Sequence, residues 1–204
     1  LFNNGNITTG STEGISNTAV GSKALFANSR GSWNSAVGST ALYSNTLGTH
    51  NTAHGFMVLY HNTTGNMNTA SGNSALESNT TGSYNTSYGS SAMTYNTSGS
   101  YNTAVGFTSS WSNTSGYSNV AIGTRALYSN TTRSNLVAIG DSALLKNGTN
   151  ATGSTEATRN TAIGSKALMY NTKGYCNTAV GHNTLYSNTL GVHNTAHGFM
   201  VLYD

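Results

Sequence analysis

The sequence predicts an all-β protein, a parallel β-solenoid or β-roll in which each 17-residue repeat forms one coil. Three observations carry this prediction: a regular internal repeat, short β-branched segments that end at Gly or Asn, and a composition of small polar residues. Gly, Asn, Ser and Thr fill 112 of the 204 positions, whereas Lys and Arg together number 8, Asp and Glu together number 5, and Pro is absent. This composition is typical of a repetitive polar fibre and argues against both a disordered chain and an enzyme.

The repeat is marked by the segment Asn-Thr-Ala-x-Gly, whose eleven copies begin at every seventeenth position, with one longer spacing of twenty-four. The long unit covers residues 136–159, and we expect its seven extra residues, near 146–159, to form a loop outside the stack. A super-repeat with a constant offset of 143 places residues 1–61 on residues 144–204, with 40 of 61 positions identical. We therefore expect one continuous rod over residues 1–204, with about twelve coils, cut from a longer array.

The eleven units share residue types at fixed positions. The third position is Ala except at Ser87, the fifth is always Gly, the ninth is mostly Leu, and the twelfth is always Asn. Seventeen residues are too few for a helix pair, so we expect each unit to form strand, turn, strand and turn. Gly and Asn adopt positive φ at low cost, so they belong at the corners. The predicted corner residues are Gly21, Gly38, Gly55, Gly72, Gly89, Gly106, Gly123, Gly140, Gly164, Gly181 and Gly198, with Asn28, Asn45, Asn62, Asn79, Asn96, Asn113 and Asn130.

The fourth position predicts an interface between copies of the chain. Alternation along a strand places it on the side opposite the inward Ala of the third position. A continuous apolar stripe left in water marks an interaction surface, so we expect a homo-oligomer that buries it. The residues concerned are Val20, Val37, Val105, Ile122, Ile139, Ile163 and Val180. The identical Asn side chains of the corners are expected to form a hydrogen-bonded ladder along the stack.

Two of the segments resemble a known family. Asn119-Val120-Ala121-Ile122-Gly123 and Leu136-Val137-Ala138-Ile139-Gly140 resemble the head repeats of trimeric autotransporter adhesins, whose left-handed parallel β-rolls associate as trimers. The fuller unit, Asn17-Thr18-Ala19-Val20-Gly21 followed by Ala24, Leu25 and Asn28, is similar to repeats of bacterial surface proteins and phage-type tail fibres. The adhesin repeats are shorter, so the turns must differ. The resemblance implies a trimeric fibre, outside the cell or on a virion surface.

Residues that could carry chemistry are few. The acids are dispersed along the chain, so we expect no catalytic residues and no bound cofactor. His50, His54, His193 and His197 are weak metal candidates, because a fourth-position His could form a ring of three in a trimer; the alternative is a half-exposed imidazole at a Val position. Of the nine Asn-x-Ser/Thr sequons, Asn147 and Asn150 are the expected glycosylation candidates, because they lie in the long unit.

Three functions are compatible with these features. The first is a non-catalytic structural fibre module of an extracellular appendage: a surface filament, an adhesin shaft or a tail fibre. The second is an adhesin module that binds cell-surface glycans through its Tyr and Asn/Thr ladders, and the third is an ice-binding solenoid. The expected partner is the chain itself, as a trimer or longer filament. The net charge of +3 comes from scattered residues, so we expect no nucleic acid, and no apolar run is long enough for membrane insertion.

Overall fold

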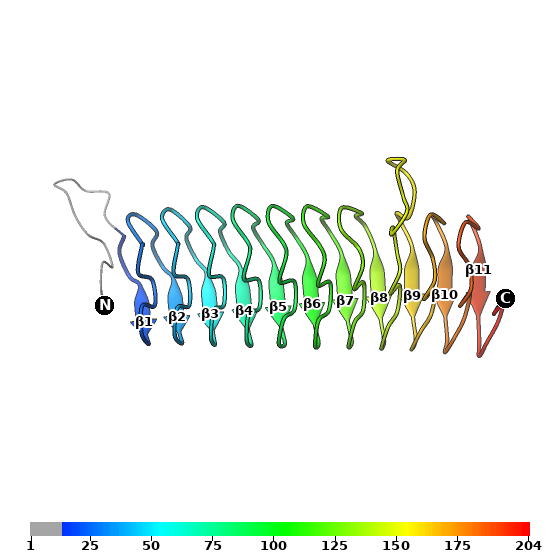
Figure 1. The fold of residues 1–204 in the computed structure, drawn as a ribbon, viewed down its shortest axis with the longest axis horizontal. Helices are drawn as coiled ribbons and strands as arrows, with labels where there is room; N and C mark the ends of the chain where they lie inside the picture. Colours follow the sequence, from blue (N-terminus) through cyan, green and yellow to red (C-terminus); the bar gives the residue numbers. More distant parts are fainter. Residues whose placement is uncertain (1–13) are drawn as a thin grey trace.

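The computed structural model describes residues 14–204, which form one rod of stacked coils (Figure 1). In this part of the chain eleven strands lie side by side, in chain order, in a single parallel sheet. A membrane-spanning helix is not found among residues 14–204. The fold is therefore the expected all-β parallel solenoid; residues 1–13, which the predicted rod includes, lie outside the described residues. The strands are β1 (Thr18–Val20), β2 (Ser35–Val37), β3 (Thr52–His54), β4 (Thr69–Ser71), β5 (Thr86–Tyr88), β6 (Thr103–Val105), β7 (Val120–Ile122), β8 (Val137–Ile139), β9 (Thr161–Ile163), β10 (Thr178–Val180) and β11 (Thr195–His197).

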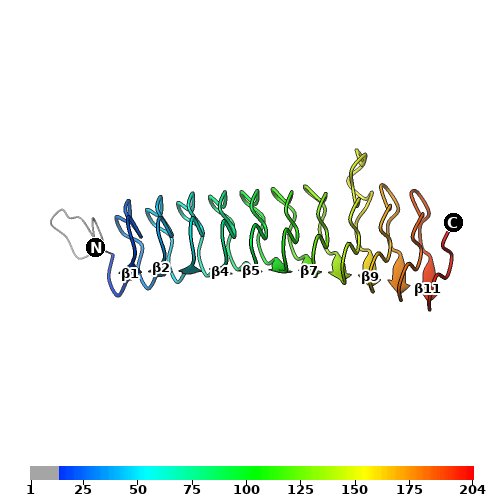
Figure 2. The same ribbon diagram turned by 60° about the horizontal axis from the view of Figure 1, so that its bottom comes forward.

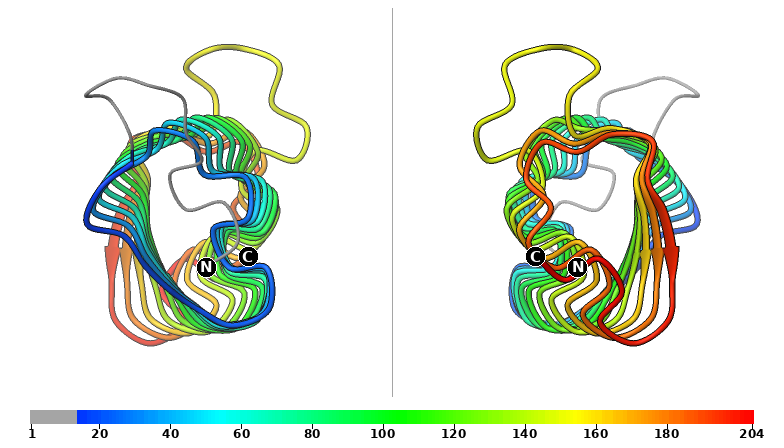
Figure 3. Two further views of the ribbon diagram at one scale, coloured as in Figure 1. Left: turned by 90° about the vertical axis from the view of Figure 1, so that its left-hand side faces the viewer. Right: turned by 90° about the vertical axis from the view of Figure 1, so that its right-hand side faces the viewer.

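Each strand pairs with the equivalent residues of the next coil. Ala104 lies beside Ala121, and Ala121 lies beside Ala138, so the repeat of the sequence is also the register of the sheet. Neighbouring strands lie about 4.8 Å apart, which makes eleven coils roughly 50 Å long. The coils form a regular row (Figure 2) and nearly superpose along the rod axis, with a gradual rotation from one end to the other (Figure 3).

The second strand predicted for each coil is wrong, because the structure has one strand per coil. Positions six to eleven form turns in which the seventh and ninth residues adopt the left-handed conformation, as at Arg125 (φ 56°) and Leu127 (φ 54°). An extended strand cannot contain residues with this φ. The turn still bonds along the rod, since the Leu127 N–H donates to the Ala143 carbonyl at 3.0 Å.

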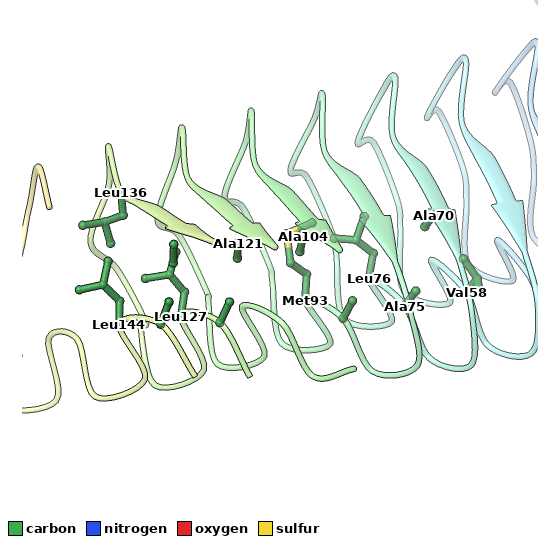
Figure 4. Close-up of a cluster of buried hydrophobic side chains, with 14 of the residues drawn as sticks. Val58, Ala70, Ala75, Leu76, Met93, Ala104, Ala121, Leu127, Leu136 and Leu144 are labelled. Atoms are coloured by element: carbon green, nitrogen blue, oxygen red, sulfur yellow. The ribbon is translucent and has the colours of Figure 1, made fainter. Parts of the chain in front are cut away.

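The core is a narrow column of small apolar side chains inside the coils (Figure 4). The third-position Ala, present in every strand except β5, faces the apolar side chains of the eighth and ninth positions; Ala121, Ala126 and Leu127 are an example, and all three are fully buried. Burial of one Leu stabilises by roughly 1.5–3 kcal/mol, so a single coil gains little. Stability must accumulate from coil to coil, as in other solenoids.

The fifth-position glycines have the positive φ expected of them. Their φ angles lie between 128° and 139°, a region that other residues rarely adopt. The coils also approach closely there, because a Cβ added at Gly123 would lie 2.6 Å from the carbonyl oxygen of Gly140. The expectation of positive φ at the twelfth-position Asn residues is wrong: none of the ten has it, and their side chains point into the coil interior instead.

Candidate functional site

The outward side of the eleven strands, which we call the sheet face, consists of the second and fourth positions of each unit. The second position is Thr in eight of the eleven strands. At the fourth position Val20 is 58% exposed and Ile122 and Ile163 are each 38% exposed, while Val37 is half-buried. All seven predicted interface residues lie in this one column, outside their own coils: Val20, Val37, Val105, Ile122, Ile139, Ile163 and Val180. The column is interrupted by His54, Ser71, Tyr88 and His197.

The twelfth-position Asn residues form a buried ladder along the rod. The side-chain N–H of Asn79 donates to the side-chain oxygen of Asn62 at 2.8 Å, and Asn96 donates to Asn79 at 2.7 Å. Each also donates to a carbonyl of its own coil, as Asn79 does to Gly82 at 2.9 Å. Buried amides need such partners, and here each coil supplies them to the next.

Two further ladders use the other abundant polar residues. The first-position Asn side chains are buried and bond similarly, since Asn85 donates to Asn68 at 3.1 Å. The Thr hydroxyls of the thirteenth position bond to the next coil, as Thr80 does to the Thr97 carbonyl at 3.0 Å. Sequence reasoning missed both, although the first-position Asn is present in ten of the eleven units.

Aromatic rings stack along the outside of the rod. Tyr43 and Tyr60 have centroids 4.9 Å apart and planes within 4°, and Tyr84 and Tyr101 have the same spacing with planes within 5°. A sugar ring packs on the face of an aromatic ring, but in these pairs the faces that point toward each other are covered. The ladders therefore contribute mainly packing between coils.

The four candidate histidines do not converge in one chain. All four are exposed; His50 stacks on Trp33 with centroids 4.8 Å apart, and His54 lies in the fourth-position column. His193 and His197 occupy the equivalent places far along the rod, where His193 precedes β11 and His197 is its last residue. Within residues 14–204 no group of three or more His, Cys, Asp or Glu side chains gathers where it could hold a metal ion.

The long unit keeps its coil and extrudes a loop, residues 148–156, that stands out from the rod (Figure 3). Asn147 keeps the twelfth-position role and donates to the Ala157 carbonyl at 2.9 Å, as other Asn residues do to the fifteenth-position Gly. Strands β8 and β9 remain in register, with Ala138 beside Ala162. The expectation that Asn147 is accessible for glycosylation is wrong, because its side chain is fully buried in the ladder; Asn150, in the loop, is exposed.

Arg133 clamps this loop to the coil before it. Its two terminal nitrogens donate to the carbonyls of Gly153 and Ala151 at 2.8 and 2.5 Å. Glu156 fixes the loop from within, since its carboxylate accepts the N–H groups of Thr152 and Gly153 and pairs with Lys173 at 3.8 Å. The two N–H groups, followed by the Lys173 and Arg133 charges, lower the pKa of Glu156 from its ordinary value.

The sequence contains a feature from which this contact could have been predicted. Arg133 stands at the fifteenth position, which is Gly in all eight other units that reach it without an insertion. A Cβ at seven of those glycines, all but Gly191, would overlap the carbonyl oxygen of the next coil; at Gly116 the distance to the Arg133 oxygen would be 2.5 Å. In the coil that follows Arg133, residues 148–156 leave the regular path to form the loop. This change leaves room for a side chain at position 133. The Asn ladder lengthens there, to 3.4 Å between Asn113 and Asn130.

Comparison with known proteins adds no family to this description. Neither the protein-family models, nor the curated proteins, nor the solved structures that we compared with the chain gave a match.

Proposed function

We propose that the chain is a non-catalytic structural module of an extracellular fibre, such as a surface filament, an adhesin shaft or a tail fibre. The observation that carries the proposal is the twelfth-position Asn ladder, which joins each coil to the next from Asn28 to Asn188. The first-position Asn and thirteenth-position Thr ladders add to it and are interrupted only at the long unit, by Leu136 and Gly148. The Asn and Thr residues that dominate the composition serve these axial bonds, as the Asn62–Asn79–Asn96 series does. A buried, charge-free ladder is insensitive to salt and suits a rod that carries load outside the cell.

The sheet face supports side-by-side assembly of the rods. Val20, Ile122 and Ile163 expose apolar surface in one column that follows the gradual rotation of the coils (Figure 3). Their own coil already covers about half or more of each side chain, so burying the remainder is worth on the order of 1 kcal/mol per residue. Seven such residues per chain favour association of the rods along this face. The resemblance to trimeric adhesin head repeats supports three copies rather than two, so the proposed unit is a homotrimer.

An antibody raised against the exposed loop, residues 148–156, tests the location and form of the fibre. Immunogold electron microscopy of intact source cells or particles should show gold along a thin appendage, with no label after competition by the loop peptide. Label found only inside permeabilised cells would overturn the extracellular assignment. A label confined to one point at the surface would argue against a fibre.

Ice binding is a second candidate because one observation favours it. The second position presents eight Thr side chains in one column, at the regular spacing of the coils, interrupted by Ser35, Val120 and Val137. Thermal hysteresis of the full chain separates the two functions: the fibre proposal expects none, and a gap that disappears in a Thr69→Leu, Thr86→Leu, Thr103→Leu variant would establish ice binding. The apolar residues in the adjacent column, such as Val105, fit the fibre proposal better.

A further inference from the structure

The loop of the long unit encloses a hollow of about 220 Å³ against the side of the rod. Its walls come from three parts of the chain. Tyr117 and Arg133 belong to regular coils, Ser154 and Thr155 to the loop, and Thr158 and Arg159 to the segment that follows the loop. The volume is below the roughly 300–1,000 Å³ of pockets for drug-sized ligands, and is suited to a single sugar ring or a similar small molecule.

The hollow is cationic. Arg133 is held in place by the Gly153 and Ala151 carbonyls, and within residues 14–204 neither it nor the exposed Arg159 forms an ion pair. The nearby carboxylate is that of Glu156, which pairs with Lys173 and accepts two N–H groups of the loop. Six of the eight Lys and Arg residues of the sequence lie within residues 125–173, together with only two acids, so this segment carries a net charge of +4. The positive charge is therefore denser in the coils from which the loop emerges than elsewhere in the sequence, and Arg133 and Arg159 are the two cations that line the hollow. A fixed guanidinium matches the paired oxygens of a carboxylate or sulfate.

The rest of the lining is suited to sugar hydroxyl groups. The exposed hydroxyls of Ser154 and Thr155 bond to no protein atom in residues 14–204, while Thr158 donates to the Thr155 carbonyl at 2.7 Å. Tyr117 is 53% exposed and stacks with no other ring in that range, in contrast to the ladder tyrosines. Its ring faces are free to pack on the apolar side of a sugar.

We propose that this hollow binds the acidic group and ring of a carboxylate- or sulfate-bearing saccharide. Arg159 and the free N–H groups of Arg133 pair with the anion, Ser154 and Thr155 bond to the ring hydroxyls, and Tyr117 packs against the ring. The site lies in one chain and away from the sheet face, so it extends the fibre proposal without depending on it.

Isothermal titration calorimetry of the full chain tests the site with four probes: glucuronate, glucose 6-sulfate, glucose and inorganic sulfate. The proposal expects glucuronate and glucose 6-sulfate to bind at least tenfold more tightly than glucose or sulfate. If glucose binds as tightly as glucuronate, the anion contact is wrong, and if sulfate binds as tightly as glucose 6-sulfate, the sugar contact is wrong. No heat with any probe, even at millimolar concentrations, would overturn the proposal altogether.

Two substitutions place the binding in the hollow. Arg159→Gln should weaken glucuronate binding at least tenfold, whereas Lys23→Gln, with the same loss of charge far along the rod, should leave it unchanged. Tyr117→Ala changes the wall instead of the loop and should weaken binding at least fivefold even if Arg159→Gln disturbs the loop. Equal affinities for the unsubstituted chain, Arg159→Gln and Tyr117→Ala would overturn the assignment.

Discussion

For single residues, the coil depends on close contacts with the neighbouring coils at the fifth and twelfth positions, where other side chains do not fit. The fifth-position Gly combines a φ near 130° with a carbonyl of the next coil directly opposite. The twelfth-position Asn combines two donated hydrogen bonds and one accepted hydrogen bond in a space that excludes water. Each is repeated in every coil, so one substitution disturbs two neighbouring coils.

Gly123→Val should strongly destabilise the rod. Val would be forced to a φ of 128°, which costs on the order of 1–3 kcal/mol, and its Cβ would lie 2.6 Å from the Gly140 carbonyl. We expect a loss of about 3 kcal/mol or more in the free energy of unfolding, measured by chemical denaturation. Thr124→Val, one residue later and exposed, is the control and should change stability little. An unchanged unfolding midpoint for Gly123→Val would show that the corner is assigned wrongly.

Asn79→Ala should cost about 2–4 kcal/mol in the free energy of unfolding. It removes the bonds from Asn79 to Asn62 and Gly82 and leaves the Asn96 amide without one acceptor, in a buried site where each lost or unmet bond costs about 1 kcal/mol or more. Asn73→Ala removes an exposed side chain that makes no hydrogen bond within residues 14–204 and serves as the control. Equal denaturation curves for the two variants would mean that the ladder contributes nothing to stability.

At the scale of the element, the long unit shows how the stack tolerates an insertion. The chain leaves the coil after Asn147 to form the loop and returns to it at Ala157. The hydrogen bond between these two residues takes the place of the Asn–Gly bond that closes each regular coil. The coil is therefore complete before and after the loop, and β8 and β9 pair as if the insertion were absent. Arg133 occupies the space that the loop opens and binds it.

Arg133→Gly should have opposite effects with and without the loop. In the natural chain it removes two bonds to the loop, so we expect faster proteolysis within 148–156 and no gain in stability. In a variant with residues 148–157 replaced by Thr-Thr-Gly, the regular coil should press on the Arg133 side chain, and Arg133→Gly should raise stability by about 1–3 kcal/mol. Thermal unfolding of the four chains measures both effects. The same sign in both backgrounds would contradict the proposed coupling.

The sequence was sufficient for the parallel solenoid and its period, because the units report directly which positions tolerate variation. The invariant Gly21 to Gly198 series indicated the corner and the Ala of the strands indicated the inward face. It was insufficient for the second half of the coil, where Leu127 and its equivalents have a left-handed conformation that a large apolar residue rarely adopts. Only the contacts with neighbouring coils impose this conformation. The hollow also depends on where the loop folds back, which local sequence does not specify.

At the scale of the whole molecule, the rod is regular along its length and differs from side to side. The sheet face carries the apolar column, and the loop carries the cationic hollow. The coils stay in register across all eleven strands. The apolar side chains therefore line up in one column, and the hollow has a fixed position along the rod. A rod with an exposed apolar column on one side and one protruding loop is consistent with the proposed fibre, in which the chains pack together and the loops remain outside.

Ile122→Asp combined with Ile139→Asp should dissociate the assembly without unfolding the chain. Both side chains lie outside their own coil, so the charge is tolerated in one chain but is unfavourable in a packed interface. Thr124→Asp combined with Ser90→Asp adds the same two charges at exposed residues outside the sheet face and is the control. Circular dichroism should be equal for the two variants, and only the first should lose mass in light scattering. Equal masses would show that the column is not the interface.

The mass of the full chain in solution tests the central proposal, a fibre built from side-by-side solenoids, most directly. Sedimentation equilibrium of the natural 204-residue chain, at several concentrations, measures it without assumptions about shape. The proposal predicts a species of three chains, each of 21.1 kDa. A well-folded chain that sediments as a single 21.1 kDa species at every concentration would contradict it.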